Sequence, residues 1–355
     1  MSNPSYKHRD TTVEALRLLL MVLIVLHHSI VHGMGLMGLL NGDTRPSLFS
    51  EIETPLAMTA NAFCICAVNC FVFISGFYGI RTNVKRFVTF MVTFVVYNLL
   101  FNTSFYLFHH ETQEAIYSLL IFSRPGYWFI NAYMYLMLFA PCINAVFASL
   151  PIGYRRVFIA VLLFISCYLG FVCGSARNPN GYTTIQLIMV YAIGRYVATR
   201  RLSLSREKAL WLYVGCSVAV GCGMYLLQLS GHRNWAWHLT SYNNPLVMAA
   251  AIGLFFFCKS FTWHNATVNR FAASAIAIYL IQSSRGAETC YYAFVNDLYS
   301  DVGAALWLLL PLFALAIVAG CLLFDRAIRP LLERLSETVC KAIAPLMMRL
   351  KSTPN

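Results

Sequence analysis

The chain has 355 residues, of which 59% are hydrophobic and only 11% are charged. Soluble domains average about 25% charged residues, so this composition excludes an ordinary soluble protein and favours an integral membrane protein. The net charge of +12 does not require a nucleic-acid partner, because basic loops beside anionic lipid explain such an excess.

Apolar stretches near the length of about 20 residues that spans the hydrocarbon core recur along the chain. We predict an all-α fold, a polytopic membrane helix bundle. Its transmembrane helices, about ten by this length criterion, are expected at residues 14–32, 56–80, 87–107, 127–147, 157–174, 182–199, 209–229, 243–259, 269–284 and 303–325. The first run has no cleavage site after it and is expected to stay as a signal-anchor helix. The stretch 113–122 is too short to span and is expected at the surface.

The distribution of loop charge predicts the orientation of these helices. With a cytoplasmic N-terminus and one crossing per span, 20 of the 26 Lys and Arg residues fall inside and 5 outside, and Arg17 lies within the first span. The five outer residues are Arg45, Arg124, Arg177, Arg233 and Arg285. This positive-inside pattern predicts an N-in, C-in topology and fits a bacterial cytoplasmic (inner) membrane.

Two regions follow from the hydropathy. Residues 1–325 form an integral membrane domain, and residues 326–355 form a cytoplasmic tail in which basic residues intervene between apolar residues near helical spacing. Such a tail is expected to lie as a helix on the inner membrane surface.

The first span carries Glu14, Arg17, His27, His28 and His32, although a charged side chain at the centre of a span costs about 2.5 kcal/mol or more. Helical geometry brings His28 back to within about 20° of Arg17, whereas His27 lies about 80° from that face. One stripe therefore carries a cation near the cytoplasmic end and an imidazole near the outer end.

Two interpretations stay open for each residue of this stripe. Arg17 either pairs with Glu14 as an interfacial anchor or binds the phosphates of a cytoplasmic acyl donor. His28 is either a hydrogen-bonded packing residue or the general base that takes the proton of a sugar hydroxyl. His28 and His32 have the spacing of a metal pair, but no carboxylate or cysteine accompanies them, so no metal is expected.

Several segments resemble the membrane acyltransferase-3 family. The run Glu14-Ala-Leu-Arg17 followed by His28 resembles its Asp/Glu-x-Leu-Arg and His signature. Residues 69–77, which end in Ser-Gly-Phe, are similar to a second segment of the family, and residues 126–141 to its Trp-Phe, Tyr and Pro helix. Weaker similarities lie at 181–196 and 278–281. The family usually has a histidine where this chain has Gln282.

The resemblance implies a bacterial O-acyltransferase of about ten spans. Its donor would be acetyl-CoA or another acyl-CoA, and its acceptor a hydroxyl of an exported or lipid-linked glycan, with membrane lipid around it and no permanently bound cofactor. The catalytic residues would be His28, Arg17 and Glu14; the donor-binding residues Arg17, Ser75, Gly76, Phe77, Lys85 and Arg86; and the acceptor-binding residues Trp128, Asn131, Tyr133 and Gln282.

Other interpretations remain for these motifs and for the function. Ser75 and Gly76 also suit close helix packing, and Trp128 suits an aromatic belt at the membrane interface. A transporter or flippase for polysaccharide units would predict internal pseudo-symmetry and helices broken near the midplane, which the sequence does not show clearly. A membrane sensor or structural subunit is a third alternative, which only the tail favours.

Overall fold

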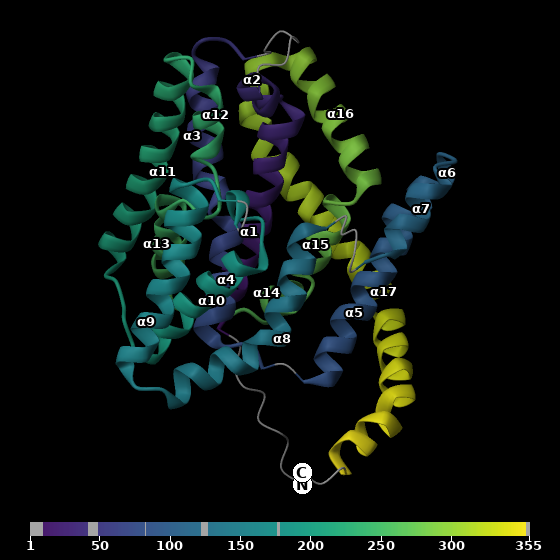
Figure 1. Cartoon of the computed structure of the whole chain (residues 1–355). Helices are drawn as coiled ribbons and strands as arrows, with labels where there is room; N and C mark the ends of the chain where they lie inside the picture. The colour runs from purple at the N-terminus through teal and green to yellow at the C-terminus, as the bar shows by residue number, and fades with distance from the viewer. Residues whose placement is uncertain (1–9, 42–48, 82, 122–126, 176–177, 353–355) are drawn as a thin grey trace.

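The computed structural model describes residues 10–41, 49–81, 83–121, 127–175 and 178–352, and side chains up to residue 345 (Figure 1). Within these ranges the chain is helical and contains no strand, which confirms the predicted all-α class. The predictions that concern Arg45, Arg124, Gly126 and Arg177 lie outside the described residues.

Several helical runs of the described chain are long and apolar enough to cross a membrane. These seven are Thr11–Gly33, Glu53–Tyr78, Val84–Phe108, Trp128–Ser149, Ile152–Val172, Arg206–Leu229 and Arg285–Pro345. The protein is therefore a multi-pass membrane protein. Helices α10 (Thr184–Thr199), α13 (Pro245–Lys259) and α15 (Ala275–Gln282) fall within three further expected spans but are shorter. The count of ten and the orientation remain predictions.

Helix α1 (Thr11–His28) lies in the middle of the bundle (Figure 1). The Asp10 side chain caps it by accepting a hydrogen bond from the backbone N–H of Thr12. Directly after His28 the helix continues as a π-helical segment, η1 (Ser29–Gly33), before α2 (Leu36–Asn41). Helix α1 packs against α3 (Glu53–Ile65), α4 (Ala67–Tyr78), α13 and α15, so its polar residues face protein on several sides.

Helices α4 and α10 approach each other closely because two glycines face the opposite backbone. A Cβ at Gly76 would collide with the carbonyl oxygen of Tyr191, and a Cβ at Gly194 would lie 2.7 Å from the Phe73 carbonyl oxygen. No side chain larger than hydrogen fits this spacing without a shift of the backbone. The structure thus supports the packing interpretation for Gly76.

The next helices form one side of the bundle. They are α5 (Val84–Asn98), the π-helical η2 (Leu99–Thr103), α6 (Ser104–Phe108), α7 (Thr112–Leu119) and α8 (Trp128–Ser149). Helix α7 corresponds to the stretch expected not to span. On the other side lie α9 (Ile152–Leu163), η3 (Phe164–Val172), η4 (Pro179–Gly181), α11 (Arg206–Leu229) and α12 (Arg233–His238).

The span expected at 269–284 is interrupted. Helix α14 (Ala266–Ala272) ends before Ser274, α15 follows, and α16 (Arg285–Val302) begins after Ser284, whose side chain accepts a hydrogen bond from the N–H of Ala287. After η5 (Gly303–Ala305), α17 (Leu306–Ser352) runs without a break past residue 325. The expected tail is thus continuous with the last long helix, and its place on the membrane surface remains a prediction.

Candidate active site

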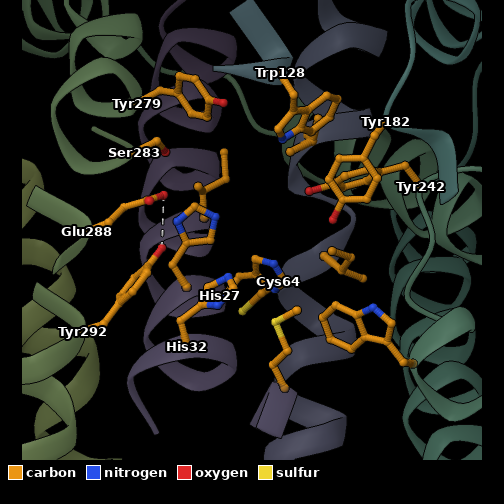
Figure 2. A pocket seen from close by; sticks show the side chains of 16 residues that line it. His27, His32, Cys64, Trp128, Tyr182, Tyr242, Tyr279, Ser283, Glu288 and Tyr292 are labelled. Atoms are coloured by element: carbon orange, nitrogen blue, oxygen red, sulfur yellow. Dashed lines mark hydrogen bonds between the residues drawn. The ribbon is translucent and has the colours of Figure 1, made fainter. Parts of the chain in front are cut away.

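A cavity of about 270 Å³ lies where α1 passes into η1. We call it the histidine cavity, because His27, His28 and His32 all line it. Figure 2 shows two facing groups of side chains around α1: Trp128, Tyr182 and Tyr242 on one side and Tyr279, Ser283, Glu288 and Tyr292 on the other. A substrate in this cavity would meet imidazoles, hydroxyls, a carboxylate and aromatic faces.

His28 is fixed by Gln282. Its Nδ1 lies 2.8 Å from Gln282 Nε2 and 3.2 Å from Gln282 Oε1. The hydrogen bond at Nδ1 decides which ring nitrogen of His28 carries the proton. When the Gln282 amide oxygen accepts a hydrogen bond from Nδ1–H, the lone pair that a base needs is on Nε2. Gln282 was expected to bind the acceptor; the structure places it against the imidazole of His28, and acceptor binding stays a prediction.

His27 lines the same cavity, although the helical angle separates it from His28. The two ring centroids are 5.3 Å apart, and His27 Nδ1 lies 2.6 Å from Asn61 Oδ1 of α3. The cavity is bordered by α3 on one side of α1 and by α15 and α16 on the other, so neighbouring faces of α1 both reach it. Asn61 was not identified from the sequence.

The aromatic wall opposite the histidines is rigidly held. Trp128 stacks on Tyr242, with centroids 5.3 Å apart, and meets Tyr182 edge-on at 4.6 Å. The Tyr242 carbonyl oxygen accepts hydrogen bonds from Gln186 Nε2 at 2.7 Å and Asn69 Nδ2 at 2.8 Å. These buried amides position the wall. In the sequence, the one sign that Asn69 and Gln186 have a structural role is that these polar residues stand within apolar runs.

On the opposite wall a carboxylate and a phenol interact beside His32. Tyr292 donates a hydrogen bond to Glu288 Oε1 at 3.4 Å. His32 stacks on the Tyr292 ring at 4.8 Å between centroids. Glu288 lies in α16, between the spans expected at 269–284 and 303–325, and no motif in the sequence identified it.

The four expected acceptor residues divide into two groups. Trp128 lines the histidine cavity and Gln282 contacts His28, whereas Asn131 and Tyr133 are not among the cavity's lining residues. Five residues after Trp128, Tyr133 lies about 140° around the helix. Its hydroxyl is 3.1 Å from Ser75 Oγ. Asn131 is buried, and among the described residues its amide has no hydrogen-bond partner.

A second cavity, of about 370 Å³, lies between α5, α8, α15 and α17. Arg86, Arg329, Tyr133 and Asp325 line it, and we call it the arginine cavity. Of the expected donor residues, Arg86 lines it directly and Ser75 contacts it through Tyr133.

The remaining donor candidates lie elsewhere. Lys85 is exposed in the first turn of α5, and Gly76 is engaged in helix packing. Phe77 packs on Phe255, with centroids 4.9 Å apart, and lies 5.5 Å from Lys259 Nζ. The structure therefore does not gather these three into the arginine cavity.

Glu14 and Arg17 form the pair that their spacing suggests. Arg17 Nη1 donates to Glu14 Oε1 at 2.7 Å. The Glu14 side chain is 8% exposed and the Arg17 side chain 28%. Arg17 is not among the residues that line the arginine cavity. The ion pair coexists with a guanidinium that remains partly accessible.

A buried polar cluster at the start of the expected tail was missed. Asp325 accepts hydrogen bonds from the Tyr97 hydroxyl at 2.8 Å and from Arg329 Nη2 at 2.5 Å, and Arg329 Nη2 also donates to Ser274 Oγ at 2.7 Å. The only sequence signal is an Asp and an Arg four residues apart after an apolar run. We assigned Arg329 to a surface tail, whereas its head lines the arginine cavity.

One aromatic layer separates the two cavities. Phe129 stacks on Tyr133, with centroids 5.5 Å apart, and meets Tyr279 edge-on at 5.4 Å. Tyr133 lines the arginine cavity and Tyr279 the histidine cavity. A cavity lined by two arginines and two acidic residues and a cavity lined by imidazoles therefore lie on either side of this aromatic layer. In the described part of the chain no group of three or more His, Cys, Asp or Glu side chains is arranged to hold a metal ion.

Comparison with known proteins agrees with the motifs. The model of the acyltransferase 3 family, described as an acyltransferase domain, matches residues 10–326, nearly the whole chain. The family expected from the sequence is thereby confirmed. No curated protein and no solved structure matches the chain.

Proposed function

We propose a reaction for this chain, which belongs to the acyltransferase 3 family and is a multi-pass membrane acyltransferase. It transfers an acetyl or other short acyl group from cytoplasmic acyl-CoA to a hydroxyl of an exported or lipid-linked glycan. The enzyme acts in the cytoplasmic membrane of a bacterium, with ten crossings and both termini inside, as the loop charges predict.

His28 is the general base of this reaction. Its Nε2 removes the proton of the glycan hydroxyl as the oxygen attacks the thioester carbonyl. Collapse of the tetrahedral intermediate breaks the carbon–sulfur bond, and the leaving thiolate of coenzyme A takes up the proton. Gln282 orients the imidazole by its contact with Nδ1. Trp128, Tyr182 and Tyr242 supply the face on which the sugar rests.

The arginine cavity binds the donor. Arg86 and Arg329 line it, and the partly exposed Arg17 is proposed to contact the donor as well. Guanidinium groups bind phosphate oxygens with two parallel hydrogen bonds, so these residues suit the phosphates of coenzyme A. The acyl end would reach His28 past the layer formed by Phe129 and Tyr133.

The observation that carries this proposal is the contact of His28 with Gln282 inside a cavity of hydrogen-bonding aromatics. Its test is mass spectrometry of the surface glycans of cells with and without the protein. We expect glycans to gain the mass of one acetyl group per modified sugar when the protein is present. Identical glycan masses in the two strains would contradict the proposal.

A flippase for polysaccharide units is the alternative. The interrupted run α14–α15–α16 favours it, because broken helices often line transport sites. It predicts a change in the amount of exported glycan without any change in its acyl content. The same mass spectra therefore distinguish the two functions.

A further inference from the structure

Another cavity adjoins the histidine cavity and takes part in no step of the proposed reaction. It has a volume of about 710 Å³, and its lining residues belong to the η2–α6–α7 segment, the end of α5 and the start of α16. Ser283 and Glu288 line both spaces. We call it the α7 groove, and its position lets a molecule held beside His28 extend past Glu288.

Hydrogen bonds fix the walls of the α7 groove. Asn98 Nδ2 donates to the Ser118 carbonyl oxygen of α7 at 2.8 Å. Asn102 Nδ2 donates to Asn98 Oδ1 at 2.9 Å, and Asn102 Oδ1 accepts from the backbone N–H of Arg285 at 2.6 Å. These bonds join α7 and the first turn of α16 to neighbouring turns of one helix. The groove is therefore part of the packed fold.

The lining of the groove combines carboxylates with aromatic rings. The carboxylates of Glu111, Glu114 and Glu288 line the groove and can accept hydrogen bonds from the hydroxyl groups of a ligand. Tyr106 and Tyr117 add apolar faces with a polar tip. Charged side chains are costly in hydrocarbon, so this lining suits water and a polar ligand better than lipid chains.

The charge of the groove narrows the class of ligand. Three carboxylic side chains line it against two basic ones, Arg285 and His109, so its lining favours an uncharged sugar over an acidic one. The histidine cavity alone, at about 270 Å³, falls below the range of about 300–1,000 Å³ for sites that bury drug-sized molecules. It suits one sugar ring, whereas the groove beside it has room for more.

We infer that the α7 groove is a second acceptor subsite. It binds the uncharged sugar units next to the one that is acylated beside His28. The acceptor is accordingly a glycan of two or more sugars. This inference rests on the proposed glycan acceptor.

The test uses the surface glycan of the producing strain, deacetylated and separated into fractions of one, two and four sugars. Acetyl transfer from radiolabelled acetyl-CoA is measured with the full-length protein in membranes. We expect the KM of the one-sugar fraction to be about two- to tenfold higher than the KM of the longer fractions. A single aromatic contact contributes a factor of this size. Tyr106→Ala should raise KM for the longer fractions by a similar factor and leave that of the one-sugar fraction unchanged.

Tyr154→Ala is the matched control, because Tyr154 is an exposed tyrosine of α9 far from the groove lining. It should change neither KM. Glu114→Gln serves as a second groove variant if Tyr106→Ala does not reach the membrane. Equal KM values for all fractions, or an equal effect of Tyr106→Ala on all of them, would overturn the subsite. Absence of transfer to any fraction would instead overturn the glycan acceptor itself, and the subsite with it.

Discussion

Glu14 and Arg17 depend on each other. Glu14 is buried, and its Oε1 accepts from Arg17 while its Oε2 has no partner among the described residues. Removing one member of a fully buried ion pair costs about 3–5 kcal/mol, because the other charge is left uncompensated; the cost here is smaller, because Arg17 is 28% exposed. Arg17→Ala alone therefore changes stability and donor binding together.

The double variant Glu14→Gln/Arg17→Gln separates these two effects. It removes both charges and leaves no buried charge unpaired. We expect acetyl-CoA affinity to fall in Arg17→Ala and in the double variant alike, but the melting temperature to fall clearly only in Arg17→Ala. Calorimetric titration and thermal melting of the purified protein measure both. If the double variant bound acetyl-CoA with wild-type affinity, Arg17 would not be a donor-binding residue but only an interfacial anchor.

Some residues of the site were predictable because they lie on one helix. Periodicity places Arg17 and His28 on one stripe and predicts the contact between Glu14 and Arg17, which the structure contains. The bond between Tyr97 and Asp325 joins residues 228 positions apart, so no local pattern reveals it. Arg329 was assigned to the tail for the same reason.

At the scale of helices, α4 and α10 pack closely through Gly76 and Gly194. Gly76 meets the backbone of Tyr191 so closely that a Cβ there requires the helices to separate. Gly153, at the start of α9, has no atom within 4 Å of such a Cβ. Substitution of Gly76 by alanine therefore tests the close contact, and the same substitution at Gly153 is its matched control.

Gly76→Ala should destabilise the protein by about 1–3 kcal/mol, the usual cost of overpacking, and Gly153→Ala should leave it unchanged or slightly more stable. The measurement is thermal melting of both variants in the same detergent. A melting temperature of Gly76→Ala equal to that of the wild type would mean that the helices separate at no cost.

The apolar runs predicted where most helices lie, because burial in lipid or protein demands such runs. They did not predict where helices break. The π-helical turn after His28 and the gap between α14 and α15 contain no proline. Gly33, in that π-helical turn, faces Val295 of α16, which would lie 2.5 Å from a Cβ built on Gly33, and a single sequence does not show such a neighbour.

At the scale of the whole molecule, the proposed reaction takes its donor from the cytoplasm and its acceptor from the outside. The arginine cavity must therefore open toward the cytoplasm and the histidine cavity toward the outside. Ser203 and Ser230 are both exposed and stand just before and just after α11 (Arg206–Leu229). The charge distribution places Ser203 inside and Ser230 outside.

Ser203→Cys and Ser230→Cys test this orientation, in a background where the exposed cysteines are replaced by serine. An impermeant maleimide should label position 230 in intact cells and position 203 only after permeabilisation. The two substitutions differ from serine by one atom, so they perturb the fold little. Labelling of position 203 from outside would reverse the topology and place the donor site on the wrong side.

The most direct test of the account is acyl transfer by His28→Gln, compared with His27→Ala in the same membranes. Glutamine keeps hydrogen bonding but cannot take up a proton. Loss of a general base costs about 10²–10⁴-fold in rate. We expect that loss in His28→Gln at normal expression. His27→Ala removes the contacts of His27 with Asn61 and with the His28 ring but leaves the proposed base in place, so it should retain most activity. Wild-type rates in His28→Gln, above all together with an inactive His27→Ala, would contradict the assignment of His28 as the base.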